Sequence, residues 1–345
     1  MGSKMAEEKE KITDQSSNVE FKFQFHSMPD TKIPPFTEHF RFPGGLARCE
    51  PGGFVLTEEF GRHAHEIVNF KPRKDDVWVV TFPKCGTTWT QEMVWMLLND
   101  CNTELAKTTP LTIRAPFLES SHFEKMESAP PGLADLMPSL DVIDKMPSPR
   151  VIKSHLPFYL LPPNLLDTCK VVYVARNPKD VMVSYYHHHK LLKMPSYSGD
   201  FETFVNYFMN DHLVFLPYFP HILDAWAKRI HPNLLFLFYE DMKKDLRGEV
   251  EKVAQFLDKP LSEAKITLLL EHLKFDNLSK NESVNFKPAK DLGYMNDDGS
   301  FIRKGKTGDW KNHLSPELNR RVEAWIEANL ADTDLRFVME LEQQD

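Results

Sequence analysis

The sequence predicts an α/β fold, in which a single domain holds a central parallel sheet flanked by helices. Two observations predict it. Short, continuous apolar runs recur along the chain, as buried parallel strands require, and a helical pattern follows most of them. No internal repeat interrupts this alternation. We expect residues 1–20, which are polar, to form a disordered N-terminal tail, and residues 21–345 to form the one domain.

Four apolar segments are expected to be strands, and helices follow three of them. The strand segments are VWVVTF (77–82), PRVIKSH (149–155), KVVYVAR (170–176) and NLLFLFYED (233–241). The helix segments are TTWTQEMVWMLLND (87–100), NPKDVMVSYYHHHKLLK (177–193) and LRGEVEKVAQFLDK (246–259). In the second helix we place Asn177 as the N-cap and Pro178 as the first helical residue. A final helix is expected to start near Ser315-Pro316 and to run through ELNRRVEAWIEANL.

Two long segments carry weaker patterns. Residues 21–75 hold aromatic patches among prolines and glycines, and we expect them to wrap the core as irregular structure and short helices. Residues 101–149 contain the loop signals APP, MPS and MPSP, which indicate a flexible segment or lid.

Composition argues against several classes of protein. The formal net charge of -8 is unlike that of a general nucleic-acid or membrane binder, because such proteins carry a basic surplus. Four cysteines without C-x-x-C pairing indicate free thiols in a reducing compartment. No apolar run reaches the length of about 18 residues that a membrane span needs, and the N-terminus lacks the apolar core of a secretory signal. We therefore expect a cytoplasmic protein.

Candidate functional residues lie where the predicted strands end. Ligands of open α/β sheets bind outside the carboxyl ends of the strands. Four positions of this kind carry polar or aromatic groups: Lys84–Trp89, Lys153–His155, Arg176 and Tyr239-Glu240. We expect these four positions to converge on one site.

The loop after the first strand, PKCGTTW, has the parts of an anion site. Gly86, Thr87 and Thr88 open a helix whose N–H groups and dipole favour an anion, and Lys84 adds a positive charge. The nucleotide loop G-x-x-x-x-G-K-[ST] instead places its lysine after the second glycine. An ordinary βα turn with a chance lysine is the alternative. Trp89, on the first turn, is either core or a stacking face for a base.

The other strand ends supply a base and further cations. Lys153 and His155 alternate along a strand and so project to one side, and histidine suits proton abstraction near neutral pH. Arg176 and Ser184, about two turns along the next helix, suit a phosphate. The segment RKGKTGDWK (303–311) is interpreted as a loop that closes over a polyanion. Each has an alternative: His155 could be structural, Arg176 could be a salt-bridge partner, and the segment 303–311 could be a solvated basic turn.

Metal chemistry is not expected. His187, His188 and His189 lie about 100° apart around a helix and cannot share one ion well. No acidic pair is placed to hold magnesium behind the phosphate loop, which argues against a P-loop kinase or NTPase.

Together these segments resemble the cytosolic sulfotransferase family. The matching segments are PKCGTTW (83–89) for the family's PKSGTTW, RVIKSHLP (150–157), RNPKDVMVSYY (176–186) and RKGKTGDWKN (303–312). The resemblance spans about residues 76–312 and implies a P-loop-like sulfotransferase fold. It implies the donor 3′-phosphoadenosine 5′-phosphosulfate (PAPS), the product PAP and no required metal.

The resemblance also implies a role for each residue. The 5′-phosphosulfate would contact Lys84, Cys85, Gly86, Thr87 and Thr88. The 3′-phosphate would contact Arg176, Ser184, Arg303, Lys304 and Gly305. The adenine would lie between Trp89, Tyr239 and Phe275. His155 would be the general base on the acceptor, Lys153 would support the transferring group, and Lys84 would meet the charge on the bridging oxygen.

Some positions depart from the family pattern. Cys85 stands where the family usually has serine, so binding there leans on backbone N–H groups. The segment around Phe275 reads HLKFDNLSKNES instead of the family's Thr-Ser-Phe, and the dimer motif expected from Lys311 reads KNHLSPELNR, which weakens the case for a homodimer. The long N-terminal segment and the long stretch from Lys84 to His155 resemble those of retinol dehydratase, a family member whose product eliminates.

The resulting prediction is transfer of a sulfuryl group from PAPS to a hydroxyl, or an amine, of a small apolar phenol or alcohol. The acceptor would be a phenol, alcohol, sterol, catecholamine or retinoid, held by residues 101–149 and 187–220. A dehydratase that acts through a transient sulfate ester of an allylic alcohol such as retinol is the alternative. A non-catalytic nucleotide-binding protein is argued against by the presence of Lys84, Lys153 and His155.

Overall fold

The computed structural model describes residues 11–12, 22–41, 44–122, 132–193 and 195–341. The expected disordered tail therefore lies almost wholly outside the described residues. Its described part, β1 (Lys11–Ile12), pairs antiparallel with β2 (Gln24–Ser27).

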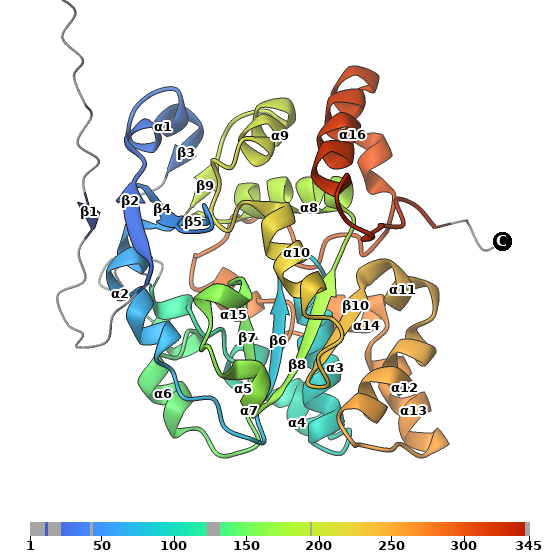
Figure 1. Cartoon of the computed structure of the whole chain (residues 1–345). Helices are drawn as coiled ribbons and strands as arrows, with labels where there is room; N and C mark the ends of the chain where they lie inside the picture. The colour runs from blue at the N-terminus through green and yellow to red at the C-terminus, as the bar shows by residue number, and fades with distance from the viewer. Residues whose placement is uncertain (1–10, 13–21, 42–43, 123–131, 194, 342–345) are drawn as a thin grey trace, which may run out of the picture.

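The predicted parallel sheet is confirmed and lies at the centre of the molecule (Figure 1). Its strands are β6 (Val77–Thr81), β7 (Val151–Ser154), β8 (Lys170–Ala175) and β10 (Leu234–Phe238). They run parallel in the order β10-β8-β6-β7. All five residues of β6 are buried, which explains its unbroken apolar sequence.

Helices cover both faces of this sheet, as predicted. Alternate residues of β6 enter two different cores: Trp78 and Val80 pack in one, Val77 and Val79 in the other. The first core includes residues of α8 (Pro178–Leu191), α10 (Tyr218–Ala227) and α16 (Pro316–Leu330). The second includes residues of α3 (Thr87–Leu98), α12 (Leu246–Phe256) and α13 (Glu263–His272).

The predicted helix caps are also confirmed. The Asn177 side chain accepts a hydrogen bond from the Asp180 N–H at the start of α8, and Pro178 is the first helical residue. The Ser315 side chain accepts from the Leu318 N–H at the start of α16. Each cap satisfies a backbone donor that the first helical turn leaves without a partner.

For residues 21–75 the prediction of short helices is confirmed by α1 (Phe36–His39) and α2 (Glu58–Val68), but the prediction of otherwise irregular structure is wrong. Together with β1, this region forms a second, antiparallel sheet in the order β1-β2-β4-β5, with β4 (Leu46–Glu50), β5 (Val55–Thr57) and the helix α2. Phe25 of β2 packs so closely on Gly61 of α2 that a Cβ there would lie 2.9 Å from the Phe25 Cβ. These strands have two to five residues, too few to show a clear period of two in the sequence.

The segment expected to be a flexible lid contains short helices. They are α4 (Thr103–Thr108), α5 (Leu111–Arg114) and α6 (Leu140–Lys145), while residues 123–131 lie outside the described part of the chain. The remaining short elements are α1 (Phe36–His39), β3 (Phe40–Arg41), α7 (Leu165–Thr168), β9 (Ser196–Tyr197), α9 (Phe201–Met209), α11 (Tyr239–Lys244), α14 (Phe275–Lys280) and α15 (Lys287–Asp291).

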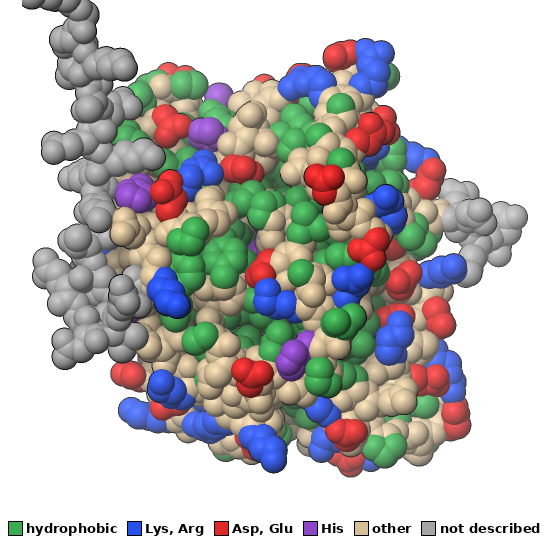
Figure 2. All heavy atoms as spheres, viewed as in Figure 1, with side chains coloured by type: hydrophobic (Ala, Val, Ile, Leu, Met, Phe, Trp, Pro, Cys, Tyr) green, Lys and Arg blue, Asp and Glu red, His purple; other side chains and the backbone are tan. Residues whose placement is uncertain are grey.

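The surface carries side chains of both charges. On the face shown in Figure 2, acidic and basic side chains are interspersed. Among the described residues, no helix is both long and apolar enough to cross a membrane. All four cysteines are buried and unpaired.

Candidate active site

The carboxyl ends of the central strands open into one cavity of about 340 Å³. Twelve of the fifteen predicted site residues line it: Lys84, Gly86, Thr87, Thr88, Trp89, Lys153, His155, Arg176, Tyr239, Phe275, Arg303 and Gly305. Three do not: Cys85, Ser184 and Lys304. The Cys85 side chain is fully buried away from the cavity, and burial raises its thiol pKa, so only its backbone can face an anion.

The loop between β6 and α3 is shaped around its glycine. Lys84 and Gly86 both have positive φ angles, 68° and 99°, which turn the chain into the first helical residue, Thr87. A Cβ on Gly86 would lie 2.8 Å from Cδ2 of Tyr239. The Thr87 hydroxyl is 2.6 Å from that of Thr81, at the end of β6. The loop thus presents helix N-terminal N–H groups to the cavity.

A cluster of like charges surrounds Lys84. Burial and the charges of Lys153, Arg176 and Arg303 lower the Lys84 pKa to about 7. The Lys84 ammonium lies 4.4 Å from the centroid of the Phe301 ring. Among the described residues, no acidic side chain pairs with Lys84. Such a concentration of positive charge is suited to a polyanionic ligand.

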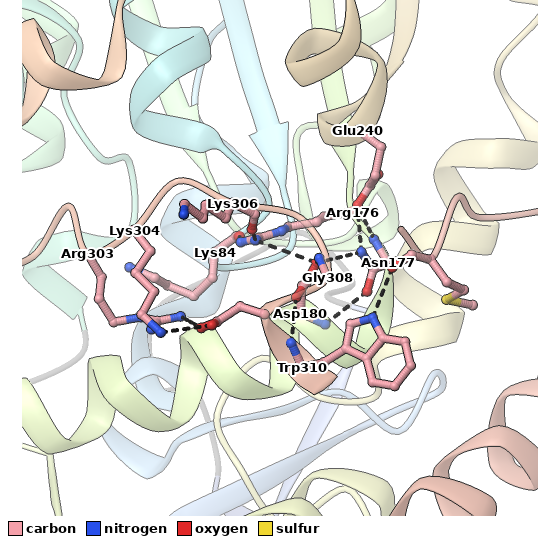
Figure 3. Close-up of polar contacts among 12 residues, drawn as sticks. Lys84, Arg176, Asn177, Asp180, Glu240, Arg303, Lys304, Lys306, Gly308 and Trp310 are labelled. Atoms are coloured by element: carbon pink, nitrogen blue, oxygen red, sulfur yellow. Dashed lines mark hydrogen bonds and ion pairs between the residues drawn. The ribbon is translucent and has the colours of Figure 1, made fainter. Parts of the chain in front are cut away.

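Arg176, at the end of β8, is held by backbone carbonyls. Its Nη1 donates to the Lys84 carbonyl at 3.2 Å and its Nη2 to the Lys306 carbonyl at 2.9 Å (Figure 3). Its guanidinium lies 4.2 Å from the centroid of the Tyr239 ring. The Nε atom is buried without a partner in the described structure. A buried donor of this kind is what a bound anion would satisfy.

The C-terminal basic loop is tied to the start of α8. Asp180 accepts from the Gly308 N–H at 2.8 Å and from the Trp310 N–H at 3.2 Å (Figure 3). Asp309 pairs with Arg303 at 2.7 Å and with Lys304 at 2.8 Å, and these cations hold its pKa below the usual range despite its burial. The exposed Lys304 side chain is thereby turned to Asp309. Neither aspartate was predicted from the sequence, although an acidic residue in the first turn of a helix, as Asp180 is in α8, is a recognisable signal.

Ser184 lies on α8, half-buried and outside the cavity lining. Three aromatic residues, Trp89, Tyr239 and Phe275, line the cavity near Arg176 and Gly305. The Trp89 ring meets the Tyr239 ring at 5.8 Å and 67°, and its Nε1 donates to the Leu273 carbonyl at 3.0 Å. Phe275 packs directly on Gly305, where a Cβ would lie 2.6 Å from the Phe275 Cε2.

His155, just beyond β7, is oriented by the neighbouring strand. Its Nδ1 donates to the Thr81 carbonyl at 2.8 Å, which leaves Nε2 as the basic nitrogen. The ring lies between Phe117 and Phe215, with centroids 5.2 Å and 5.4 Å away. Burial, and then the charge of Lys153, holds the His155 pKa well below its usual range. The imidazole is therefore neutral and able to accept a proton.

The backbone of His155 is held by two side chains that the sequence analysis missed. Its N–H donates to Glu119 at 2.6 Å, and its carbonyl accepts from His221 at 3.0 Å. Glu119 is fully buried, and burial raises its pKa to about 7; burial lowers the Lys153 pKa to about 8. The Lys153 ammonium lies 3.9 Å from the centroid of the Phe117 ring. The segment that carries Phe117 and Glu119 thus runs beside the end of β7.

The rest of the cavity has a largely apolar wall. The expected segments 101–149 and 187–220 contribute Leu133, Leu136, Met137, Leu192, Val214 and Phe215. A third segment, which the sequence analysis did not anticipate, contributes Phe286, Tyr294, Met295 and Phe301. The cavity therefore combines a cationic part with an apolar wall. His155 adjoins both, since its ring lies 5.4 Å from that of Phe215, and burial and the charges of Lys153 and Lys84 lower its pKa.

The three consecutive histidines point in different directions. The His187 ring lies 5.3 Å from that of His313, the His188 ring 5.8 Å from that of Phe301, and His189 donates to the Tyr185 carbonyl at 3.0 Å. Within the described part of the chain, no group of three potential ligands is arranged to hold a metal ion.

Comparison with known proteins agrees with this geometry. Residues 74–334 match the family model described as the sulfotransferase domain. Sulfotransferase 1B1 of Canis lupus familiaris is 34% identical over 290 residues, which are 84% of this chain and 95% of that protein. Sulfotransferase 1E1 of Homo sapiens is 34% identical over 293 residues, 85% of this chain and 96% of that protein.

Solved structures give the same result. A structure of retinol dehydratase in complex with androsterone and the inactive cofactor PAP aligns with a TM-score of 0.85 and 36% identity, covering 92% of this chain and 98% of the other. A second, in a complex with retinol and PAP, aligns with a TM-score of 0.83 and 36% identity, covering 93% and 100%.

Proposed function

This chain belongs to the cytosolic sulfotransferase family and uses PAPS as its sulfuryl donor, and on that premise we propose that it sulfates the hydroxyl of a small apolar alcohol or phenol. One observation carries the choice of acceptor: a single cavity combines a cationic part with an apolar wall, and a neutral histidine adjoins both. A small, mostly apolar acceptor fits such a wall, and His155 is placed to meet its hydroxyl.

In this proposal the donor is bound at two points. The 5′-phosphosulfate lies at the N-terminus of α3, against Lys84 and the backbone from Cys85 to Thr88. The 3′-phosphate lies between Arg176 and the loop of Arg303 to Gly305. The unpartnered Arg176 Nε supports this fit because it provides a free donor. Gly86 and Gly305 let the rings of Tyr239 and Phe275 lie directly against the two loops that bind the donor. Trp89, Tyr239 and Phe275 flank the adenine.

Ser184 and Lys304 contribute less directly in this arrangement. Ser184 reaches the 3′-phosphate only after a side-chain adjustment, and Lys304 must leave Asp309 to contact it. Arg303 lines the cavity while pairing with the same aspartate, so it is the more direct contact of the two cations.

The residues of the chain then have distinct chemical roles. The donor, when bound, supplies an activated sulfuryl group. Nε2 of His155 takes the proton of the acceptor hydroxyl as that oxygen attacks. Lys84 offsets the negative charge left on the phosphate oxygen, and Lys153 offsets charge on the transferring group. No acid–base role falls to any other side chain in this step.

Elimination of the sulfate ester is the second candidate outcome. It is supported by the retinol dehydratase structures, which are 36% identical and cover over nine-tenths of this chain, more than the 84–85% covered by the curated sulfotransferases cited above. On this reading an allylic alcohol is sulfated first, and the ester then loses sulfate to give an alkene.

We also place the protein in the cytosol, which its four free, buried thiols support.

The experiment supplies sulfur-labelled PAPS with a panel of phenols, sterols, catecholamines and retinoids, and identifies the products by mass. We expect PAP to form with at least one apolar alcohol or phenol, with the label in a sulfate ester or in free sulfate beside an alkene. Catecholamines, which carry a charge, are expected to be poor acceptors. No PAP formation with any apolar acceptor, or a clear preference for charged ones, would contradict the proposal.

A further inference from the structure

His188 is a cavity residue to which the proposed sulfuryl transfer assigns no role. Its ring lines the cavity from α8, and its Nδ1 atom is buried without a hydrogen-bond partner in the described structure. His189 also lines the cavity, but its Nδ1 donates to the Tyr185 carbonyl. His187 has a buried Nε2 without a partner in the described structure, but it lies outside the cavity lining. Of the three, His188 alone combines an unpartnered ring nitrogen with a place in the cavity. An unpartnered buried polar atom is costly, so its presence calls for an explanation.

His188 and Lys84 adjoin the same aromatic ring of the cavity. Its ring meets the Phe301 ring at 5.8 Å, and the Lys84 ammonium lies 4.4 Å from the centroid of that same ring. Burial and the positive charge of Lys84 hold the His188 pKa well below its usual range, and His189, Lys153 and His155 act in the same direction. A neutral imidazole with a free nitrogen that faces the cavity can accept a proton.

Sulfuryl transfer leaves His155 unable to take a second proton in the same turnover, because it still carries the one from the acceptor hydroxyl. A step that releases a second proton before His155 loses the first therefore needs another base. Two aromatic rings adjoin His188: Tyr185 lies parallel to its ring at 6.3 Å and 14°, and Phe301 lies at its edge. Aromatic faces stabilise a nearby cation.

We propose that His188 is a second proton acceptor, which removes a carbon-bound proton and so converts a bound allylic sulfate ester into an alkene. The proposal rests on the proposed sulfuryl transfer, because that reaction supplies the ester. The C–O bond of the ester breaks, and its electron pair leaves with sulfate. The C–H electron pair next to the allylic cation becomes the new double bond, and the proton passes to His188. Ester thus gives alkene, sulfate and one proton, with no oxidant or reductant.

The test gives PAPS and an allylic alcohol to the wild-type protein and to the variants His188→Phe and His188→Gln. Alkene and sulfate ester are measured by mass and expressed per PAP formed, so that a general loss of activity cancels. We expect the wild type to form alkene, and both variants to lower the alkene fraction by about 100-fold, the low end of general-base effects, while ester accumulates. His187→Phe, the same change one residue earlier and outside the cavity lining, should keep the wild-type ratio.

The two His188 variants distinguish between two roles of this residue, proton acceptor and hydrogen-bond partner. Glutamine can donate and accept hydrogen bonds but cannot take up a proton at neutral pH. A wild-type ratio in His188→Gln would therefore overturn the proposal and make His188 a residue that binds the acceptor.

A second measurement bypasses sulfuryl transfer. The preformed allylic sulfate ester is added with PAP to the wild-type protein and to His188→Phe. We expect rapid elimination only with the wild type, and equal rates would overturn the proposal. If the wild type releases stable esters of every allylic alcohol, the role of His188 is refuted while the proposed sulfuryl transfer stands. Failure to form PAP with any acceptor would instead contradict the proposed function itself.

Discussion

The Nδ1–H group of His155 donates a 2.8 Å hydrogen bond to the carbonyl oxygen of Thr81, the last residue of β6. Because a carbonyl oxygen can only accept, this bond places the proton on Nδ1 and leaves a lone pair on Nε2. The backbone of one central strand thus selects the tautomer of the proposed base at the end of the next strand.

The first prediction concerns this base. His155→Ala should lower the turnover number by about 10²- to 10⁴-fold, the usual contribution of a general base. PAP affinity should persist, because the groups proposed to bind the nucleotide come from other segments. Turnover is measured with labelled PAPS, and PAP binding by calorimetry. Normal turnover in this variant would refute the assignment.

The second prediction concerns Glu119, which accepts the backbone N–H of His155 at 2.6 Å. Glu119→Gln keeps an acceptor for that N–H, whereas Glu119→Leu leaves it buried and unpaired, which costs about 1–3 kcal/mol in free energy of unfolding. We expect the leucine variant to be less stable in denaturant titrations and to turn over more slowly than the glutamine variant. Equal stability and turnover of the two would show that the hydrogen bond does not position His155.

The third prediction is the pH dependence of PAP binding. The Lys84 pKa is lowered to about 7, so the fraction of charged Lys84 in the ligand-free protein falls as the pH rises through that value. The phosphates of PAP are fully ionised well above their second pKa of about 6, so from about pH 7 to 9 the change comes from the protein. Affinity should weaken by up to about tenfold per pH unit.

Titration calorimetry at several pH values measures this slope. Lys84→Met should bind PAP more weakly at pH 7 and show a much shallower slope. Lys153, whose pKa is also lowered by burial, is expected to contribute to the slope that remains. A slope in Lys84→Met as steep as in the wild type would assign the titration to a different group.

The fourth prediction uses a pair of glycines with positive φ angles. Gly86→Ala places a Cβ 2.8 Å from the Tyr239 ring, whereas at Gly53, with φ 70°, the nearest atom to a new Cβ is 3.9 Å away on Arg48. Both changes add similar backbone strain, of order 1 kcal/mol. Only Gly86→Ala should also weaken PAP binding, by roughly tenfold or more, because it displaces Tyr239 from under Arg176. Equal PAP affinity of the two variants would contradict a tightly fitted loop.

The fifth prediction concerns Asp180, which accepts from Gly308 and Trp310 and so holds the basic loop on α8. Asp180→Ala should weaken the binding of PAP by about tenfold, because Arg303 loses its fixed position. Binding of adenosine 5′-monophosphate, which lacks the 3′-phosphate, should change much less. A similar loss for both ligands would mean that Asp180 supports the whole site and not the 3′-phosphate end.

Local signals explain what could be predicted of the fold. A cap such as Asn177 acts on a backbone N–H three residues away, and a doubly buried strand such as β6 must be apolar throughout, so both are visible in a short window of sequence. The antiparallel N-terminal sheet was missed because its strands are short and are stabilised by pairing with each other and by packing on α2. Neither kind of contact leaves a periodic pattern in so few residues.

The same distinction applies to the site. The sequence by itself determined the anion-binding loop, because Lys84, Gly86 and the helix start are contiguous and carry an anion-binding geometry of their own. The class of donor followed from the resemblance of four short segments to the sulfotransferase family. Only the tertiary structure decided which nitrogen of His155 is free. It also brought Glu119, 36 residues away in the chain, to the backbone N–H of His155, and it placed His188 and Phe301 on the same cavity. These relationships join segments far apart in the chain, and their energies come from burial and contact, which arise only when the chain is folded.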